Sequence, residues 1–178
     1  LLVITGVGIA IGVVLSLLFI CDSSTTITDH EVVIENFLGY KELIVVGELN
    51  VDLILNNIEG FPKIGTEIIA NNMNLTLGSS SAIMAANAAA MGISTSFCGV
   101  VGNDNYGDFI TSELKKKSVH TEFITKNSAL QSGITIVMNY DQDRANVTYC
   151  GAMEALTFDL IPWDTLSEFK HFHFSPRG

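Results

Sequence analysis

Residues 78–92 read GSSSAIMAANAAAMG, and this stretch decides the fold of the region around it. A glycine and three serines suit a turn with a helix cap, the alanine-rich run favours a helix, and Gly92 can end that helix. Residues 73–77, directly before it, read as a short strand. The local layout is therefore a strand, a Gly-Ser turn and a helix.

The segments on either side continue the alternation of strands and helices. Residues 43–46 form an apolar run that ends at a glycine, which is typical of a buried central strand. Further strands are predicted at 95–101 and 170–175, and a helix that Asn103 or Asp104 can cap lies between them. This order predicts an α/β fold, in which helices cover the faces of a parallel sheet.

Two pairs of short strands interrupt this order and predict a small antiparallel lid beside the main sheet. The first pair is separated by Asn71-Asn72, which suits a tight turn because asparagine tolerates positive φ. The second pair flanks a hairpin turn at 141–144. The four strands are predicted at residues 66–70, 73–77, 133–140 and 145–150, and the whole lid at about 51–77 and 133–150.

The first 40 residues differ from the rest of the chain. Residues 1–20 carry no charge and are long enough to cross a bilayer as a helix. A signal peptide is not favoured, because the segment lacks a basic start and a small-x-small cleavage site. Three interpretations stay open: a sequence joined to the domain by truncation or a gene-boundary error, a membrane anchor, or a buried helix. The predicted organisation is a hydrophobic, transmembrane-like segment at 1–21, a linker at 22–40 and a globular domain at 41–178.

Composition narrows the classes of function. The net charge of −10 argues against nucleic-acid binding, and the one basic run, residues 115–117, falls in a predicted helix where a solvated face explains it. Cys21, Cys98 and Cys150 have no metal-type spacing, and their odd number argues against a disulfide framework. We therefore expect a reducing compartment, namely the cytoplasm, unless residues 1–20 anchor the chain in a membrane.

The first polar cluster is the run GELNVD at residues 47–52, which follows the first strand of the sheet. In open α/β sheets, ligands bind outside the carboxyl ends of the strands. Asn50 and Asp52 can therefore exchange hydrogen bonds with the hydroxyl groups of a sugar diol. Alternatively, they order a turn by bonding to backbone groups.

The second cluster is the turn of Gly78, Ser79 and Ser80, which opens the alanine-rich helix. Free N–H groups at a helix N-terminus can hold phosphate or the oxygens of a polyol. A plain capped helix explains the same residues. The turn is not a Walker A loop, because no Gly-Lys-Ser/Thr follows it.

Together these motifs resemble the ribokinase/PfkB family of carbohydrate kinases, from about residue 42 to the end of the chain. The GELNVD run is similar to the family's G-x-N-x-D element. Residues 78–92 are similar to its N-terminal signature, with the small residue and the last glycine of that helix in place. The chain departs from the signature at two positions: Ser79 replaces its second glycine, and Ile83 replaces an asparagine that contacts the sugar. The second change leaves the identity of the sugar open.

The resemblance implies a ribokinase-like sheet with flanking helices and a lid, and ATP-dependent phosphorylation of a sugar hydroxyl with Mg²⁺. The substrate-binding residues that it implies are Asn50, Asp52, Gly78, Ser79, Ser80 and Ser175. The family's catalytic base is the aspartate of a G-A-G-D motif, which these 178 residues do not contain. We therefore assign no catalytic, cofactor or metal residue. The chain is expected to be a truncated, sugar-binding half of the kinase, inactive by itself.

Lids of this family often pair between subunits, so an exposed lid edge would support a homodimer. Arg144, in the predicted hairpin turn, could reach an anionic sugar, although a solvated turn residue explains it equally simply. The alternative function is a non-catalytic sugar-binding module that residues 1–20 tether to a membrane.

Overall fold

The computed structural model describes residues 27–28, 31–32, 41–140 and 142–175. The chain divides into two compact units, residues 1–40 and residues 41–178. In the first unit, β1 (Ile27–Thr28) and β2 (Glu31–Val32) pair antiparallel. The hydrophobic helix predicted at 1–20 lies outside the described residues. Within the described ranges, no helix has the length and apolar character needed to cross a membrane.

The main sheet of the second unit has four parallel strands in the order β10-β3-β6-β7. The strands are β3 (Lys41–Gly47), β6 (Thr95–Gly102), β7 (His120–Asn127) and β10 (Phe169–Ser175). All eight residues of β6 and residues 43–47 of β3 are buried, as expected for central parallel strands covered on both faces. The edge strands β7 and β10 carry more exposed positions.

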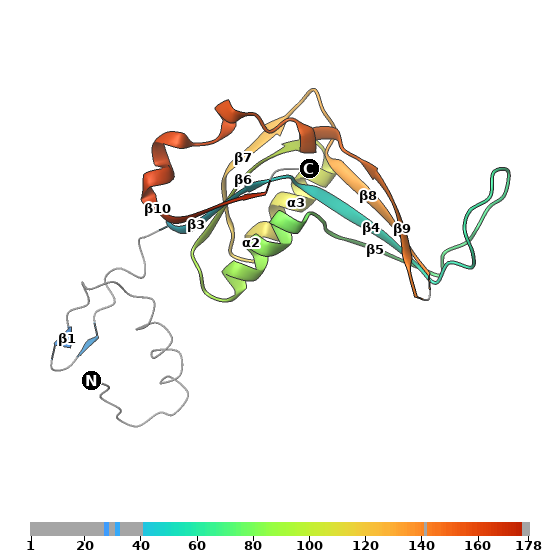
Figure 1. The fold of residues 1–178 in the computed structure, drawn as a ribbon, viewed down its shortest axis with the longest axis horizontal. Coiled ribbons are helices and arrows are strands. Elements are labelled where there is room, and N and C mark those ends of the chain that lie inside the picture. The colour runs from blue at the N-terminus through green and yellow to red at the C-terminus, as the bar shows by residue number, and fades with distance from the viewer. Residues whose placement is uncertain (1–26, 29–30, 33–40, 141, 176–178) are drawn as a thin grey trace. The chain divides into compact units, whose positions relative to one another are not determined.

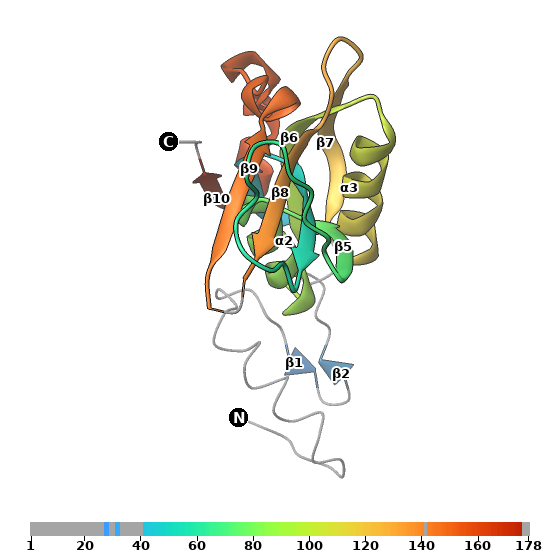
Figure 2. The same cartoon turned by 90° about the vertical axis from the view of Figure 1, so that its right-hand side faces the viewer.

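Helices and 3-10 helices cover opposite faces of this sheet (Figures 1 and 2). The elements are α2 (Ser80–Ala90), α3 (Asn105–Lys116), η1 (Gly151–Glu154), η2 (Phe158–Leu160) and η3 (Trp163–Glu168). Residues of α2 and α3 pack with Val45 and Phe97 on one face. On the other face, Ile161 packs with Ile44 and Cys98. The predicted parallel sheet with flanking helices is confirmed.

A second sheet, the lid, has the strand order β5-β4-β8-β9. Its strands are β4 (Asn50–Asn56), β5 (Asn72–Leu77), β8 (Gly133–Asn139) and β9 (Arg144–Tyr149). The two inner strands run parallel, and each outer strand pairs antiparallel with its neighbour. Figure 1 shows the lid extending away from the main sheet, with the long connection at 57–71 beyond its far end.

The two faces of the lid differ in polarity, because side chains alternate along each strand. Cross-strand pairing places Asp52, Thr135 and Thr148 side by side on one face. The opposite face is apolar and partly exposed, and Met73 and Val147 have exposed fractions of 63% and 58%. That apolar face consists of Leu53, Leu55, Met73, Leu75, Ile136, Met138, Val147 and Tyr149.

Three sequence predictions within the lid region are wrong. The lid is not antiparallel throughout, because its inner strands β4 and β8 pair parallel. Residues 66–70 are not a strand, and Asn72 does not lie in a tight turn but begins β5. The first hairpin is instead β4 and β5, joined by the connection at 57–71. The Ile68-Ile69 pair has strand-like composition, yet Ile69 is 75% exposed and has no strand to pack against. Strand β7 was not predicted at all.

Candidate functional site

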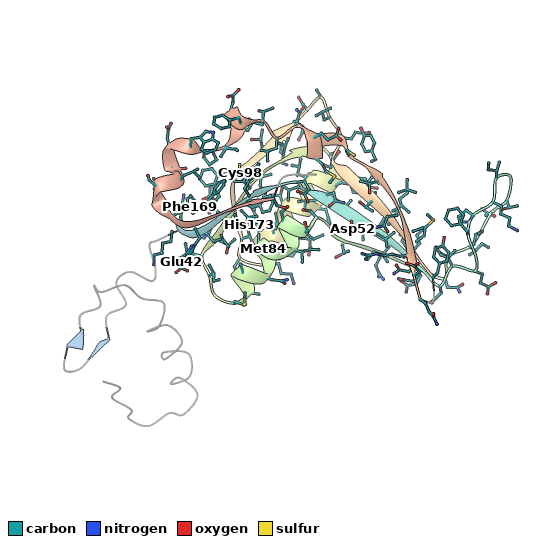
Figure 3. All side chains as sticks on the ribbon, in the orientation of Figure 1. Glu42, Asp52, Met84, Cys98, Phe169 and His173 are labelled. Atoms are coloured by element: carbon teal, nitrogen blue, oxygen red, sulfur yellow. The ribbon has the colours of Figure 1, made fainter. Side chains whose placement is uncertain are left out.

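Three of the predicted residues meet where the lid joins the main sheet. Asn50 and Asp52 open strand β4, and the Gly78 N–H donates to the Asn50 carbonyl at 3.0 Å. A β-carbon on Gly78 would lie 2.6 Å from Asn50 Oδ1 and closer still to Asp52 Oδ1. Glycine is therefore the residue that lets the turn approach both polar side chains. Figure 3 shows Asp52 on β4 at this junction.

The side chain of Asn50 organises its neighbours. Its Nδ2 donates to Thr135 Oγ1 at 2.9 Å and to Asp52 Oδ1 at 3.2 Å. Thr135 in turn shares a hydrogen bond of 3.0 Å with Thr148 across the lid. Asn50 is 3% exposed, and among the described residues its Oδ1 has no hydrogen-bond partner. Because an unpaired buried amide oxygen is costly, this atom is a candidate acceptor for a bound hydroxyl group.

Asp52 carries the negative charge of this cluster. Partial burial raises the pKa of its carboxyl above the usual range, while the hydrogen bond from Asn50 and the charge of Arg144 act in the opposite direction. Arg144 is exposed on β9 and lies, by strand alternation, on the same face of the lid as Asp52. A partly desolvated carboxylate gains from hydroxyl donors, so Asp52 suits a polyol ligand.

Hydroxyl groups order the turn before α2. Ser79 caps the helix by accepting from the Ala82 N–H at 3.3 Å, and its φ of 65° lies in the left-handed region that favours glycine. Ser79 Oγ donates to the Glu48 carbonyl at 2.7 Å, and Ser81 Oγ donates to the same carbonyl at 3.0 Å. These bonds attach the turn to the end of β3 and offset the conformational cost at Ser79.

A pocket of about 630 Å³ lies at the carboxyl ends of β3 and β10. Glu48 and Ser175 line it, and Ser175 pairs with Gly47 across the sheet. This is the end of a parallel sheet where ligands bind. The remaining lining residues are Gly47, Met153, Glu154, Leu156, Thr157, Phe158, Ile161 and Phe174.

The structure brings together some of the predicted site residues but not all. Asn50, Asp52 and Gly78 are in direct contact, and Ser175 lines the pocket beside Glu48, to which Ser79 is bonded. Ser80, by contrast, is exposed and lines a separate apolar pocket of about 600 Å³ on α2. Ile83 lines that same pocket and is 44% exposed.

Sequence reasoning missed two residues of this region, Thr135 and Glu48. Thr135 lies 85 positions from Asn50, and only the pairing of β4 with β8 brings them together. No local pattern signals such a contact. Glu48 lies within the GELNVD run, where its carboxylate beside a strand end was the available signal.

Asp104 has a structural role, as its position before a helix predicted. Its carboxylate accepts from the Gly107 N–H at 2.8 Å, from the Ser132 N–H at 2.8 Å and from the Ser132 hydroxyl at 2.7 Å. Burial alone would raise the pKa of Asp104, but these hydrogen bonds outweigh burial and the pKa lies below the usual range. The residue thereby ties the start of α3 to the start of β8.

The described residues contain no cluster of three or more metal-ligating side chains. Across 41–140 and 142–175, no three His, Cys, Asp or Glu side chains converge as ligands would. The site in this part of the chain is one of hydroxyl, amide and carboxylate groups.

Comparison with known proteins identifies relatives of the second unit. The model of the "pfkB family carbohydrate kinase" matches residues 41–176. The ribokinase of Bacillus subtilis is 26% identical over 117 residues, which cover 66% of this chain and 40% of that protein. A sugar kinase of Pyrococcus horikoshii is 28% identical over 136 residues, which cover 72% of this chain and again 40% of the relative. The chain thus spans about two fifths of the length of these relatives.

Solved structures show the same fold. The crystal structure of an uncharacterized sugar kinase from Pyrococcus horikoshii superposes with a TM-score of 0.63 at 28% identity, over 74% of this chain and 42% of the other. The ribokinase of Thermotoga maritima gives a TM-score of 0.63 at 27% identity, over 72% and 43% of the two chains. The second unit therefore has the ribokinase-like α/β fold.

Proposed function

Because the chain belongs to the pfkB family of carbohydrate kinases, we propose that residues 41–178 bind the sugar whose hydroxyl group is phosphorylated from ATP. The observation that supports this most directly is the contact of Asn50, Asp52 and Gly78. It sets one amide and one carboxylate against a glycine turn at the carboxyl end of the first core strand. The Asp52 carboxylate and the Asn50 amide oxygen can accept hydrogen bonds from adjacent hydroxyl groups of one sugar.

Each residue has a distinct part in this proposal. Asp52 accepts hydrogen bonds from two sugar hydroxyls, and the amide of Asn50 holds that carboxylate in place. The N-terminus of α2, which follows Ser79, offers N–H groups to sugar oxygens. The lid face that carries Asp52 and Thr135 covers the sugar and limits the access of water.

The phosphoryl group would come from ATP with Mg²⁺, and a related ribokinase structure from Escherichia coli contains both. Within the described ranges, no three His, Cys, Asp or Glu side chains cluster as metal ligands, and we assign no residue of this chain to ATP or Mg²⁺. We propose that these 178 residues, which lack a G-A-G-D motif, bind sugar but do not transfer phosphate. We also propose a cytoplasmic location. The alternative is a non-catalytic sugar-binding module that residues 1–20, outside the described part, tether to a membrane.

Sugar binding can be tested on the chain itself. D-ribose and D-fructose, the acceptors named by ribokinase and fructokinase relatives, are titrated onto ¹⁵N-labelled protein, and amide shifts of β4 and the turn at 78–80 are followed. Asp52→Asn should abolish the shifts, while Asp164→Asn, an equal charge change on exposed η3, should not. Shifts that survive Asp52→Asn, or the absence of any in the wild type, would contradict the proposal.

The apolar lid face supports a second proposal, that two copies pair through their lids. Sheets pack face to face when both inner faces are apolar, and Val147 and Tyr149 are half exposed or more. Sedimentation should show a dimer that Val147→Lys converts to a monomer. Thr148→Lys, on the opposite lid face, should leave the dimer intact. A wild-type monomer at high concentration would exclude this arrangement.

A further inference from the structure

One oxygen of the Glu48 carboxylate is buried and, within the described residues, has no hydrogen-bond partner. The other, Oε1, lies 3.3 Å from the Ser79 hydroxyl. Withdrawing a carboxylate oxygen from water without supplying a donor is strongly unfavourable. Oε2 is therefore an acceptor for which these residues provide no donor.

The turn before α2 is held mainly by the backbone carbonyl of Glu48, which accepts from the hydroxyls of Ser79 and Ser81 at 2.7 and 3.0 Å. The Glu48 side chain adds one longer contact, from the Ser79 hydroxyl to Oε1 at 3.3 Å. Neither contact involves Oε2, so holding the turn does not explain the burial of this second carboxylate oxygen.

The surroundings of Glu48 suggest one. The residue lines the pocket at the ends of β3 and β10, together with the hydroxyl residues Thr157 and Ser175. Phe158 and Phe174 line it as well, and they are 69% and 51% exposed. Carboxylates and hydroxyls bond to sugar hydroxyl groups, and aromatic rings pack against apolar C–H faces. These residue types together suit a polyhydroxylated ligand.

We propose that Glu48 is a further sugar-binding residue, whose carboxylate accepts a hydrogen bond from a hydroxyl on the part of the sugar that enters this pocket. The inference rests on the proposed function, since it assigns a second contact to the sugar that Asp52 holds. Both carboxylates contact the same glycine-serine turn: Asp52 lies against Gly78, and Glu48 lies against Ser79.

The test compares dissociation constants for the same two sugar probes, measured by NMR titration of the full chain. Glu48→Gln should weaken the binding of at least one probe about tenfold, because a charged acceptor is replaced by a neutral one. Asp159→Asn is the matched control, since this carboxylate on η2 is exposed and does not line the pocket. It should leave both constants unchanged.

A direct readout does not depend on any variant being stable. With ¹³C in the side-chain carboxyls of glutamate, the Glu48 resonance should move when the probe is added to wild-type protein. The Glu154 resonance, from the same pocket, shows whether a shift is specific to Glu48. A Glu48 resonance that stays in place at saturating probe overturns the inference, even if Glu48→Gln does not fold.

The outcomes separate this inference from the proposed function. If Asp52→Asn loses binding while Glu48→Gln binds like the wild type, the role of Glu48 is wrong and the proposed function stands. If Glu48→Gln loses binding while Asp52→Asn does not, the pocket binds polyols but the assigned kinase site is wrong. Absence of binding by the wild type contradicts both.

Discussion

Gly78 lies directly against the carboxylate of Asp52, so closely that a β-carbon at this position would overlap Oδ1. The same β-carbon would be 2.6 Å from Asn50 Oδ1. Strand β4 and the turn before α2 are more than 20 positions apart in the sequence. They meet at Gly78, where there is room only for a hydrogen atom.

Gly78→Ala should therefore destabilise the fold and weaken sugar binding together. Because Asn50 is buried and cannot move far, overpacking should lower the free energy of unfolding by about 1–3 kcal/mol. Gly92→Ala is the control: its φ of 89° should cost about 1 kcal/mol, with no atom near the new methyl group. Urea unfolding measures both effects. Equal binding by the two variants would argue against the contact at Gly78.

The raised pKa of Asp52 predicts that this residue costs stability at neutral pH. In the folded state the carboxyl holds its proton to a higher pH than in the unfolded state. Its contribution to the free energy of unfolding therefore falls as the pH rises from the ordinary value of 3.8 through the raised pKa. The Asp52→Asn protein should be more stable than the wild type at about pH 7. This gain in stability should vanish when the pH is below the ordinary aspartate pKa of 3.8. A less stable Asp52→Asn protein at neutral pH would show that burial does not dominate at this residue.

The lowered pKa of Asp104 predicts the opposite pH dependence of the free energy of unfolding. Its pKa is lowered, so the stability that it contributes is complete above the ordinary value of 3.8 and is lost as the pH falls through the lowered pKa. Asp104→Ala should cost about 2–3 kcal/mol, because it removes a helix cap and leaves the Ser132 N–H without its acceptor. Asp108→Ala removes an exposed ion pair with Lys126 and a carboxylate in the first turn of α3, and should cost less than about 1 kcal/mol. Equal losses in the two variants would refute the role of Asp104 in joining α3 to β8.

The two described cysteines should differ in reactivity. Burial raises the pKa of the Cys98 thiol to about 11, and its Sγ donates to the Leu160 carbonyl at 3.6 Å. Cys150 is only partly buried. In a Cys21→Ser background, a disulfide reagent at neutral pH should label Cys150 in the native protein and Cys98 only after unfolding, since the thiolate is the reactive form. Rapid labelling of Cys98 in the folded state would contradict its burial between the sheet and the 3-10 helices.

The parts of the fold that follow from local chemistry could be predicted. The GSSS turn, the alanine run and Gly92 specify α2 through neighbouring residues, and the apolar run at 43–46 specifies β3. Strand β7 (HTEFITKN) could not be found in this way, because an edge strand with mixed exposure lacks a clear apolar pattern. Residues 66–70 were wrongly predicted as a strand. Their composition is typical of a strand, but no neighbouring strand pairs with them.

In the candidate site as well, residues in local motifs could be predicted, whereas a residue brought in by strand pairing could not. Asn50, Asp52 and Gly78 belong to two motifs that the sequence shows, and the pairing of β4 with β5 brings them into contact. Thr135 depends on the pairing of β4 with β8, which brings together residues far apart in the chain. Such contacts are decided by the register between strands, which residue type alone does not reveal.

The alternation of polar and apolar faces in the lid limits how the chain can change in length. Adding or deleting a single residue inside β4 or β8 would exchange the two faces, turning Asp52 or Thr135 toward the apolar side and apolar residues toward the sugar. The connection at 57–71 has no such constraint, because lengthening an exposed loop costs little entropy. Length variation among homologous chains is therefore expected to concentrate in that connection, while the lid strands vary in residue type alone.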